Sequence, residues 1–208
     1  MHPGRFISLD GIDGAGKSAQ VGPLAAWLDG RGIHVVTCRD PGSTAVGDAI
    51  RAILLDRRDL RPDATCEMLL YMAARAQLAA EVIRPALARG AWVISDRFLL
   101  ANVVYQGHAG GLAAATVRDV GRVATGGLEP DLVLLLDVDL ETSARRLARP
   151  LDKLEDRGDG YRGRLLDGYR AEAARDPDRI RVIDGSAGVA EVGRAIRAAV
   201  TQRFPELA

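Results

Sequence analysis

The sequence lacks a surplus of either charge, which argues against a protein that acts on nucleic acid. Lys and Arg together number 28, Asp and Glu also number 28, and the formal net charge at pH 7 is zero. Proteins that bind nucleic acid normally carry a basic surplus that displaces the counterions of the phosphates. Apolar residues make up 48% of the chain and charged residues 27%, as in ordinary globular proteins. We therefore expect a folded protein with no nucleic-acid partner.

Cysteine and long apolar runs are also scarce. Two cysteines, Cys38 and Cys66, are too few to staple 208 residues, and they indicate either a reducing compartment or two buried thiols. No apolar run reaches the roughly 18 residues that span a bilayer. The first residues do not form a basic segment followed by an apolar stretch. The sequence therefore predicts no signal peptide, no membrane partner and a cytoplasmic location.

Short apolar segments alternate with longer segments in which apolar residues recur at helical spacing. The predicted strands are 5–10, 33–37, 91–95, 131–137 and 179–183, and the predicted helices are 18–28, 46–55, 64–87, 113–124, 140–148, 161–174 and 189–204. Pro85 is expected to kink or split the third of these helices. The alternation predicts an α/β fold with a five-stranded parallel sheet and helices on both faces, in one domain over residues 1–208. Ligands of such sheets bind at the carboxyl ends of the strands.

A glycine-rich segment follows the first predicted strand and precedes the first predicted helix. It has the full G-x-x-x-x-G-K-S pattern, in Gly11, Ile12, Asp13, Gly14, Ala15, Gly16, Lys17 and Ser18. Backbone N–H groups of such a loop surround phosphates, Lys17 reaches the β- and γ-phosphates, and the Ser18 hydroxyl is a Mg²⁺ ligand. Lys17 is one of only two lysines in the chain, the other being Lys153. The sequence therefore predicts binding of ATP with Mg²⁺.

The rest of the chain favours a small kinase. An N-K-x-D guanine motif is absent from the sequence, which argues against a GTPase, and 208 residues are few for a motor ATPase. Three arginines on different segments, Arg51, Arg75 and Arg97, are candidate cations for a second phosphorylated ligand. Asp96 and Arg97 are the first two residues after the predicted strand 91–95, so both are expected to point into the cleft.

Several further motifs, in order and at matching spacing, make the chain resemble the thymidylate kinases from residue 6 to about residue 169. They are RDPGST from Arg39, AIRAILL from Ala49, LYMAARAQ from Leu70, DRF at Asp96, YQG at Tyr105, EPDL at Glu129 and DKLE at Asp152. The resemblance is to members whose phosphate loop carries no arginine, because Gly14 stands at that position. It implies the P-loop nucleoside monophosphate kinase fold with a short lid near 149–160, a homodimer, and phosphorylation of dTMP to dTDP by ATP.

The resemblance also implies roles for individual residues. Arg51 and Arg97 match arginines that hold the acceptor phosphate, and Arg75 matches one that contacts the base. Asp96 is expected beside Mg²⁺, with Asp40 as a further acid near it. The other implied contacts are the base face at Tyr71, the sugar 3′-hydroxyl at Asp13, the sugar 2′ position at Tyr105 and the base edge at Gln106.

The charged segment at 149–160 resembles the lid of these kinases, and we expect it to be mobile. A lid that closes over the phosphates supplies a cation and excludes water. Arg149 is the first choice for the catalytic lid cation, beside Lys17, Asp96 and Arg97, and the competitors are Arg146, Lys153 and Arg157.

The chain departs from the family pattern next to the expected base site. Ala101 and Asn102 stand where two hydroxyl residues are usual, and Asp40 replaces a glutamate. Asn102 can both donate and accept hydrogen bonds, so thymine could still be read there. The departure leaves open a kinase of the same fold that acts on a nucleoside or a modified nucleotide. A non-catalytic nucleotide-binding module is the third hypothesis.

Overall fold

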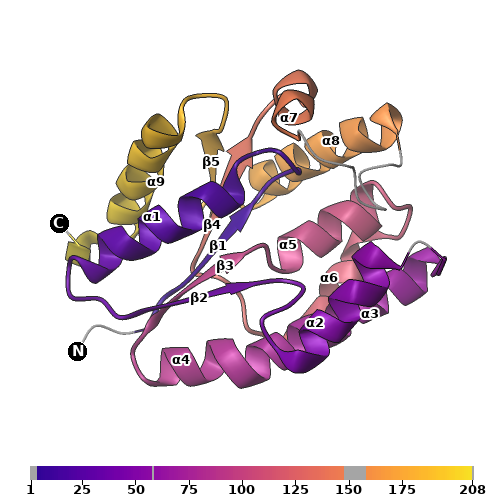
Figure 1. Cartoon of the computed structure of the whole chain (residues 1–208), viewed down its shortest axis with the longest axis horizontal. Helices are drawn as coiled ribbons and strands as arrows, with labels where there is room; N and C mark the ends of the chain where they lie inside the picture. Colours follow the sequence, from indigo (N-terminus) through magenta and orange to yellow (C-terminus); the bar gives the residue numbers. More distant parts are fainter. Residues whose placement is uncertain (1–3, 58, 148–157, 208) are drawn as a thin grey trace.

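The structure is a computed structural model that describes residues 4–57, 59–147 and 158–207. Five parallel strands form one sheet in the order β2-β3-β1-β4-β5 (Figure 1), which confirms the predicted architecture. The strands are β1 Phe6–Asp10, β2 Val35–Arg39, β3 Trp92–Asp96, β4 Leu132–Asp137 and β5 Ile180–Asp184. The second strand lies two residues later than predicted, which brings Asp40 to the carboxyl edge of the sheet.

Nine α-helices are assigned within the described ranges. They are α1 Lys17–Asp29, α2 Ala45–Arg51, α3 Ala64–Leu78, α4 Arg84–Ala88, α5 Leu99–Asn102, α6 Ala114–Thr125, α7 Leu140–Arg146, α8 Asp159–Arg175 and α9 Val189–Arg203. Helices α1 and α9 pack together over one face of the sheet, and α4 and α8 contact the other (Figure 1). Among the described residues, no helix is both long enough and apolar enough to cross a bilayer.

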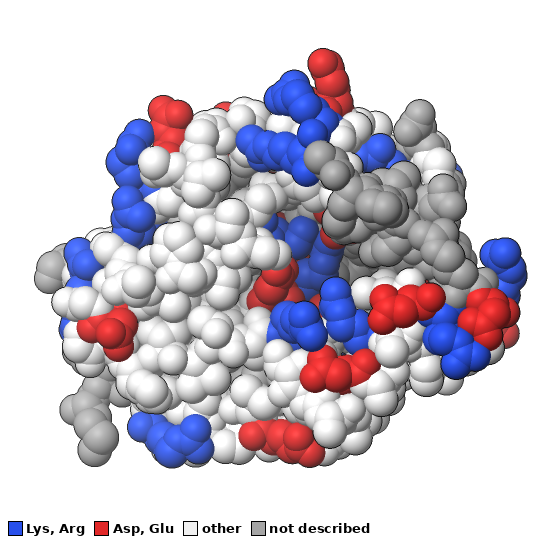
Figure 2. Space-filling view, in the orientation of Figure 1, with Lys and Arg blue, Asp and Glu red and all other residues white. Residues whose placement is uncertain are grey.

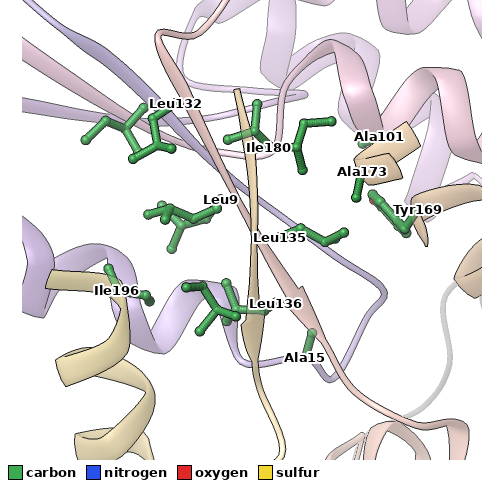
Figure 3. Packing of buried hydrophobic residues seen from close by; sticks show 14 of the residues in the cluster. Leu9, Ala15, Ala101, Leu132, Leu135, Leu136, Tyr169, Ala173, Ile180 and Ile196 are labelled. Atoms are coloured by element: carbon green, nitrogen blue, oxygen red, sulfur yellow. The ribbon is translucent and has the colours of Figure 1, made fainter. Parts of the chain in front are cut away.

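The apolar core lies on both faces of β4. Successive side chains of a strand point to opposite faces, so a strand covered on both sides is apolar throughout. Figure 3 shows Leu132 and Leu136 on the side of Ile196 from α9, and Leu135 on the side of Tyr169 from α8. This double burial explains the unbroken apolar run of β4 and fixes the loops that leave its carboxyl end.

The helix predicted at 64–87 continues through Pro85 instead of ending there. A π-helical turn, η2 Ala79–Ile83, lies between α3 and α4, and Pro85 falls in the first turn of α4. Proline has no N–H to donate, and the altered hydrogen-bond pattern of a π turn accommodates such a residue within a helix. The expected kink or split is thus a local widening of the helix.

A helix over 99–108 was not predicted. It consists of α5 followed by the π-helical η3 Val103–His108, and every residue of Val103–Gly107 is buried. A helix that is buried all round has no polar face and so no amphipathic pattern to detect. This segment carries Asn102, Tyr105 and Gln106 toward the carboxyl edge of the sheet.

Candidate active site

The loop between β1 and α1 has the backbone of a phosphate-binding loop. Gly11 and Gly14 have positive φ angles of 136° and 78°. A Cβ at Gly11 would lie 2.5 Å from the Leu136 carbonyl oxygen, and one at Gly14 would lie 2.5 Å from the Ser143 carbonyl oxygen. Both positions therefore require glycine. No side chain, arginine included, fits at Gly14 without displacing the backbone at Ser143.

Lys17 begins α1 and is folded back over this loop. Its Nζ donates to the carbonyl oxygens of Gly11 at 3.0 Å and Ile12 at 2.8 Å. Burial and the nearby Arg97 together lower the pKa of Lys17 to about 8, although Asp13 acts in the opposite direction. The loop thus holds one buried cation close to its backbone N–H groups. A bound phosphate would compete with the two carbonyl oxygens for the Lys17 ammonium group.

Ser18 and Asp96 form the candidate metal position. The Ser18 hydroxyl donates to Asp96 Oδ2 at 2.6 Å, across the gap between α1 and β3. Within the described ranges, no group of three or more His, Cys, Asp or Glu side chains could hold a metal. Mg²⁺ typically binds through one or two carboxylates together with substrate phosphates, so one hydroxyl and one carboxylate fit it.

Arg97 is the hub of a second group of side chains. Its Nη2 donates to Asp13 Oδ1 at 2.6 Å, and its Nη1 donates to the Gly11 carbonyl oxygen at 2.8 Å and to Tyr169 Oη at 3.1 Å. Tyr105 Oη donates to the other Asp13 oxygen at 2.8 Å. Burial acts to raise the pKa of Asp13, but Arg97 and Lys17 outweigh it and hold that pKa well below its usual range.

The backbone at Arg97 is also unusual. Its φ angle is 69°, a left-handed conformation that non-glycine residues adopt at a cost and that clusters at functional sites. Its N–H donates to the Leu9 carbonyl oxygen at 2.9 Å. The turn therefore aims the guanidinium back across the strand ends, toward Asp13.

A buried chain of polar side chains lies beyond Arg97. Arg75 Nε donates to Asp40 Oδ2 at 2.6 Å, and Arg75 Nη1 donates to Asn102 Oδ1 at 2.8 Å. Asn102 Nδ2 donates to Gln106 Oε1, and Gln106 Nε2 donates to Glu67 Oε1 at 2.8 Å. Burial raises the pKa of the Asp40 carboxyl, and Arg75 opposes that rise. Asp40, expected near Mg²⁺ and among the substrate-binding residues, donates its N–H to the Asp96 carbonyl oxygen at 3.0 Å, while its carboxylate accepts from Arg75.

Two cavities meet at the carboxyl edge of the sheet. A wide one of about 680 Å³ extends from the phosphate loop to the segment between β5 and α9, and a narrow one of about 110 Å³ is lined by Tyr71, Arg75 and Asn102. Figure 2 shows basic and acidic side chains gathered in the hollow near the middle of this face. The residues that line both cavities are Asp13, Asp40, Arg51 and Arg97. Two ligands could thus meet end to end at a carboxylate–arginine junction.

The structure brings the predicted site residues together, apart from the lid. Ser18, Lys17 and Asp96 line the wide cavity, and Ala101, Tyr105 and Gln106 line the narrow one with the residues named above. Arg149, Lys153 and Arg157 lie outside the described residues. The remaining lid candidate, Arg146, lines the wide cavity and donates to the carbonyl oxygens of Gly185 at 2.7 Å and Ser186 at 3.0 Å.

Two residues of this site were not given a role from the sequence. Tyr169 lies on α8, 72 residues from Arg97, and only the fold shows the contact between them. Glu67 lies in the first turn of α3, where an acidic residue indicates only a helix start. Of the two thiols, Cys38 is buried and Cys66 is exposed, so the second of the two alternatives drawn from the sequence, two buried thiols, is wrong for Cys66.

The fold and the two joined cavities define a phosphate-loop kinase that acts on a nucleoside monophosphate. The family profile described as thymidylate kinase matches residues 9–196. The chain therefore belongs to the thymidylate kinase family.

Individual relatives agree with this assignment. A thymidylate kinase of Rhodopirellula baltica is 45% identical over 197 residues, which cover 95% of this chain and 80% of the relative. One of Chromohalobacter salexigens is 44% identical over 208 residues, covering 98% of each. The crystal structure of thymidylate kinase from Ehrlichia chaffeensis matches with a TM-score of 0.78 at 27% identity, covering 95% of this chain and 99% of that one.

Proposed function

We propose that this protein transfers the γ-phosphoryl group of ATP to dTMP, giving ADP and dTDP. The observation that carries the proposal is the junction of the two cavities. The wide cavity is lined by the phosphate loop, and the narrow cavity is lined by Tyr71 and Arg75. Arg97 lines both cavities and lies at their junction. Phosphoryl transfer needs donor and acceptor aligned in this way, with cations around the moving group.

The donor end relies on backbone N–H groups and one cation with exchangeable partners. Lys17 exchanges its loop carbonyl partners for the β- and γ-phosphates of ATP. Ser18 and Asp96 would hold Mg²⁺, which neutralises charge on the phosphates when bound. Because the Ser18 hydroxyl and the Asp96 carboxylate already lie 2.6 Å apart, little side-chain movement is needed to bring both to one ion.

The acceptor end combines cations for the phosphate with polar groups for the nucleoside. Arg51 and Arg97, which line both cavities, hold the dTMP phosphate. Asp13 accepts a hydrogen bond from the sugar 3′-hydroxyl, and Tyr105, fixed by its bond to Asp13, crowds the 2′ position. Thymine stacks on Tyr71, with its polar edge toward Arg75 and Asn102 and with Gln106 beside it.

The phosphate loop itself leaves one catalytic role open. The loop carries no arginine, because Gly14 stands at the position where related loops can have one. The lack of room for a side chain at Gly14 supports placing the chain among the kinases without this arginine. A further cation must then come from the lid, and Arg149 is our first candidate. Arg146 is a second, because it already lines the wide cavity. Closure of the lid would also exclude water, which otherwise competes with dTMP for the phosphoryl group.

We also propose a homodimer through α2, α3 and α6. These helices pack in sequence, α2 on α3 and α3 on α6. Each exposes one large apolar side chain: Val46 on α2 is 47% exposed, Leu69 on α3 is 50% exposed and Val123 on α6 is 84% exposed. Exposed apolar groups on neighbouring helices favour a covered interface. Sedimentation of the wild type and of Leu69→Asp checks this, since a monomeric wild type would contradict it.

An assay of ADP release with a panel of acceptors tests the proposed reaction. We expect dTMP to give the highest kcat/KM among dTMP, dUMP, dCMP, dAMP and dGMP. Thymidine serves as the control for a nucleoside kinase, and we expect negligible turnover because the phosphate partners Arg51 and Arg97 would be unused. Turnover of the other acceptors but not of dTMP would contradict the proposal, and so would a preference for thymidine.

A further inference from the structure

The buried hydrogen bonds from Arg75 through Asn102 and Gln106 to Glu67 all run from donor to acceptor in the same direction, and the chemistry of the two charged residues requires this direction. A guanidinium has only donors, so Arg75 must face the oxygen of the Asn102 carboxamide. The nitrogen of Asn102 then faces Gln106 Oε1, and Gln106 Nε2 is left to face Glu67. An ionised carboxylate only accepts hydrogen bonds, so the chain begins at a donor and ends at an acceptor. Each carboxamide orientation is thus specified from both ends.

Burial makes this specification effective. Relative exposures are 1% for Arg75, 2% for Asn102, 1% for Gln106 and 3% for Glu67, so bulk water does not offer alternative partners. Glu67 also lies in the first turn of α3, where the positive helix end favours a carboxylate. Reversing either carboxamide would place two donors or two acceptors face to face in a buried site.

The orientation of Asn102 decides which base edge the narrow cavity matches. Arg75, Asn102 and Gln106 line that cavity, whereas Glu67 does not. With its oxygen toward Arg75, Asn102 offers an acceptor next to the Arg75 donors. The 3-NH of thymine can donate to the Asn102 oxygen, and its 4-carbonyl can accept from Arg75. In cytosine, N3 would place an acceptor against the Asn102 oxygen, and the 4-amino group would place a donor against Arg75. When a base competes for the Arg75 donors, only the Glu67 end still constrains the carboxamides.

We propose that Glu67 is a positioning residue for base selection: through Gln106 it holds the Asn102 carboxamide so that the site accepts a 4-oxo pyrimidine monophosphate and rejects a 4-amino one. This inference rests on the proposed dTMP kinase activity. Glu67 lines neither the wide nor the narrow cavity, and its effect is transmitted by two hydrogen bonds. The step from Glu67 to specificity can therefore be tested apart from catalysis.

The first test compares Glu67→Met with the wild type, using kcat/KM for dTMP and for dCMP. Methionine keeps the volume but accepts no comparable hydrogen bond, so Gln106 loses its fixed orientation. We expect the ratio of the two kcat/KM values to fall about tenfold through the KM of the monophosphate, with the KM for ATP unchanged. The matched control is Glu81→Met, which removes an exposed Glu–Gln77 hydrogen bond and should leave the ratio unchanged. A folded Glu67→Met protein with a wild-type ratio overturns the proposal.

A swapped pair provides a second test that also applies if Glu67→Met does not fold. Gln106→Glu alone places two carboxylates together and should lower the ratio. In the double variant E67Q/Q106E, the new carboxylate accepts from Asn102 and from the carboxamide that replaces Glu67, so the hydrogen bond between positions 67 and 106 is reversed while Asn102 still faces an acceptor and keeps its orientation. We expect its ratio to return to within about threefold of the wild type, and a double variant no better than Gln106→Glu overturns the proposal. If the wild type turns over neither nucleotide, the proposed function fails, and calorimetric Kd values for dTMP and dCMP in the same variants still decide the role of Glu67.

Discussion

The wide cavity over the phosphate loop and the narrow cavity beyond Arg97 are built from different kinds of groups. In the first, Lys17 donates to backbone carbonyl oxygens that a phosphate can replace. In the second, side chains bond to one another, from Asp40 through Arg75 to Asn102, and all three are buried. Hydrogen bonds to loop carbonyls can be exchanged for bonds to a phosphate, which suits a lysine that stabilises the transferred phosphoryl group. Hydrogen bonds between buried side chains hold those side chains in place, which suits recognition of a rigid base. We therefore expect the wide cavity to set the rate and the narrow one to set the choice of monophosphate.

Lys17→Ala should have the largest effect. It removes the cation that we propose stabilises charge on the transferred group, and the loss of such a group costs about 10²- to 10³-fold in kcat or more. We expect the thermal unfolding midpoint to stay near the wild-type value, because the hydrogen bonds of Lys17 within the described part of the chain go to loop carbonyl oxygens. Steady-state kinetics with dTMP and ATP measure the effect. Near-normal turnover would overturn the assignment of the phosphate loop.

Arg97→Lys probes the junction between the cavities. Lysine keeps the charge but cannot reproduce the bonds of the Arg97 guanidinium to Asp13, Gly11 and Tyr169. We expect the KM for dTMP to rise roughly 10- to 100-fold, the range of one or two charge-assisted hydrogen bonds. Affinity for ATP should change little. Loss of ATP binding with an unchanged KM for dTMP would place Arg97 on the donor side instead.

The pH dependence should differ between the two ends. Burial lowers the pKa of Lys17 to about 8, so this cation loses its charge as the pH rises above that value. If only the charged form binds ATP, the Kd of a non-hydrolysable ATP analogue should rise toward about tenfold per pH unit above roughly pH 8 and stay flat below it. Calorimetry between about pH 7 and pH 9.5 measures this. A Kd for dTMP that rose as steeply would show that the two ends are not separate.

Asn102→Ser should have the smallest effect and the most selective one. Serine is too short to contact both Arg75 and Gln106, so the carboxamide link between them is lost. We expect kcat/KM for dTMP over dCMP to fall at least as far as for Glu67→Met, by about tenfold, with kcat at saturating dTMP almost unchanged. An unchanged ratio across pyrimidine monophosphates would make Asn102 a structural residue.

The two ends also differ in how far the sequence predicts them. The phosphate loop is continuous in sequence and lies between a strand and a helix of clear pattern, so its residues and their chemistry follow directly. The parallel sheet follows from the alternation of apolar strands and amphipathic helices, to within two residues at β2. These features depend on local sequence, which a single chain displays.

The narrow cavity depends instead on contacts between distant segments. Asp40 follows β2, Arg75 lies on α3 and Asn102 ends α5, and only packing brings them into one chain of hydrogen bonds. The helix that carries Asn102 is buried on all sides and therefore lacks the periodicity that would predict it. Glu67 lies 39 residues from Gln106, and nothing in the sequence around either residue indicates their hydrogen bond.

The most direct test of this division is the Kd of dTMP for Lys17→Ala, measured by calorimetry beside the wild type. The two cavities meet at Asp13, Asp40, Arg51 and Arg97, and Lys17 lines only the wide one. We predict that the variant binds dTMP within about twofold of the wild type while its affinity for an ATP analogue falls at least about tenfold. A parallel loss of both affinities would contradict the account, because the rate-setting and base-selecting ends would then be one site.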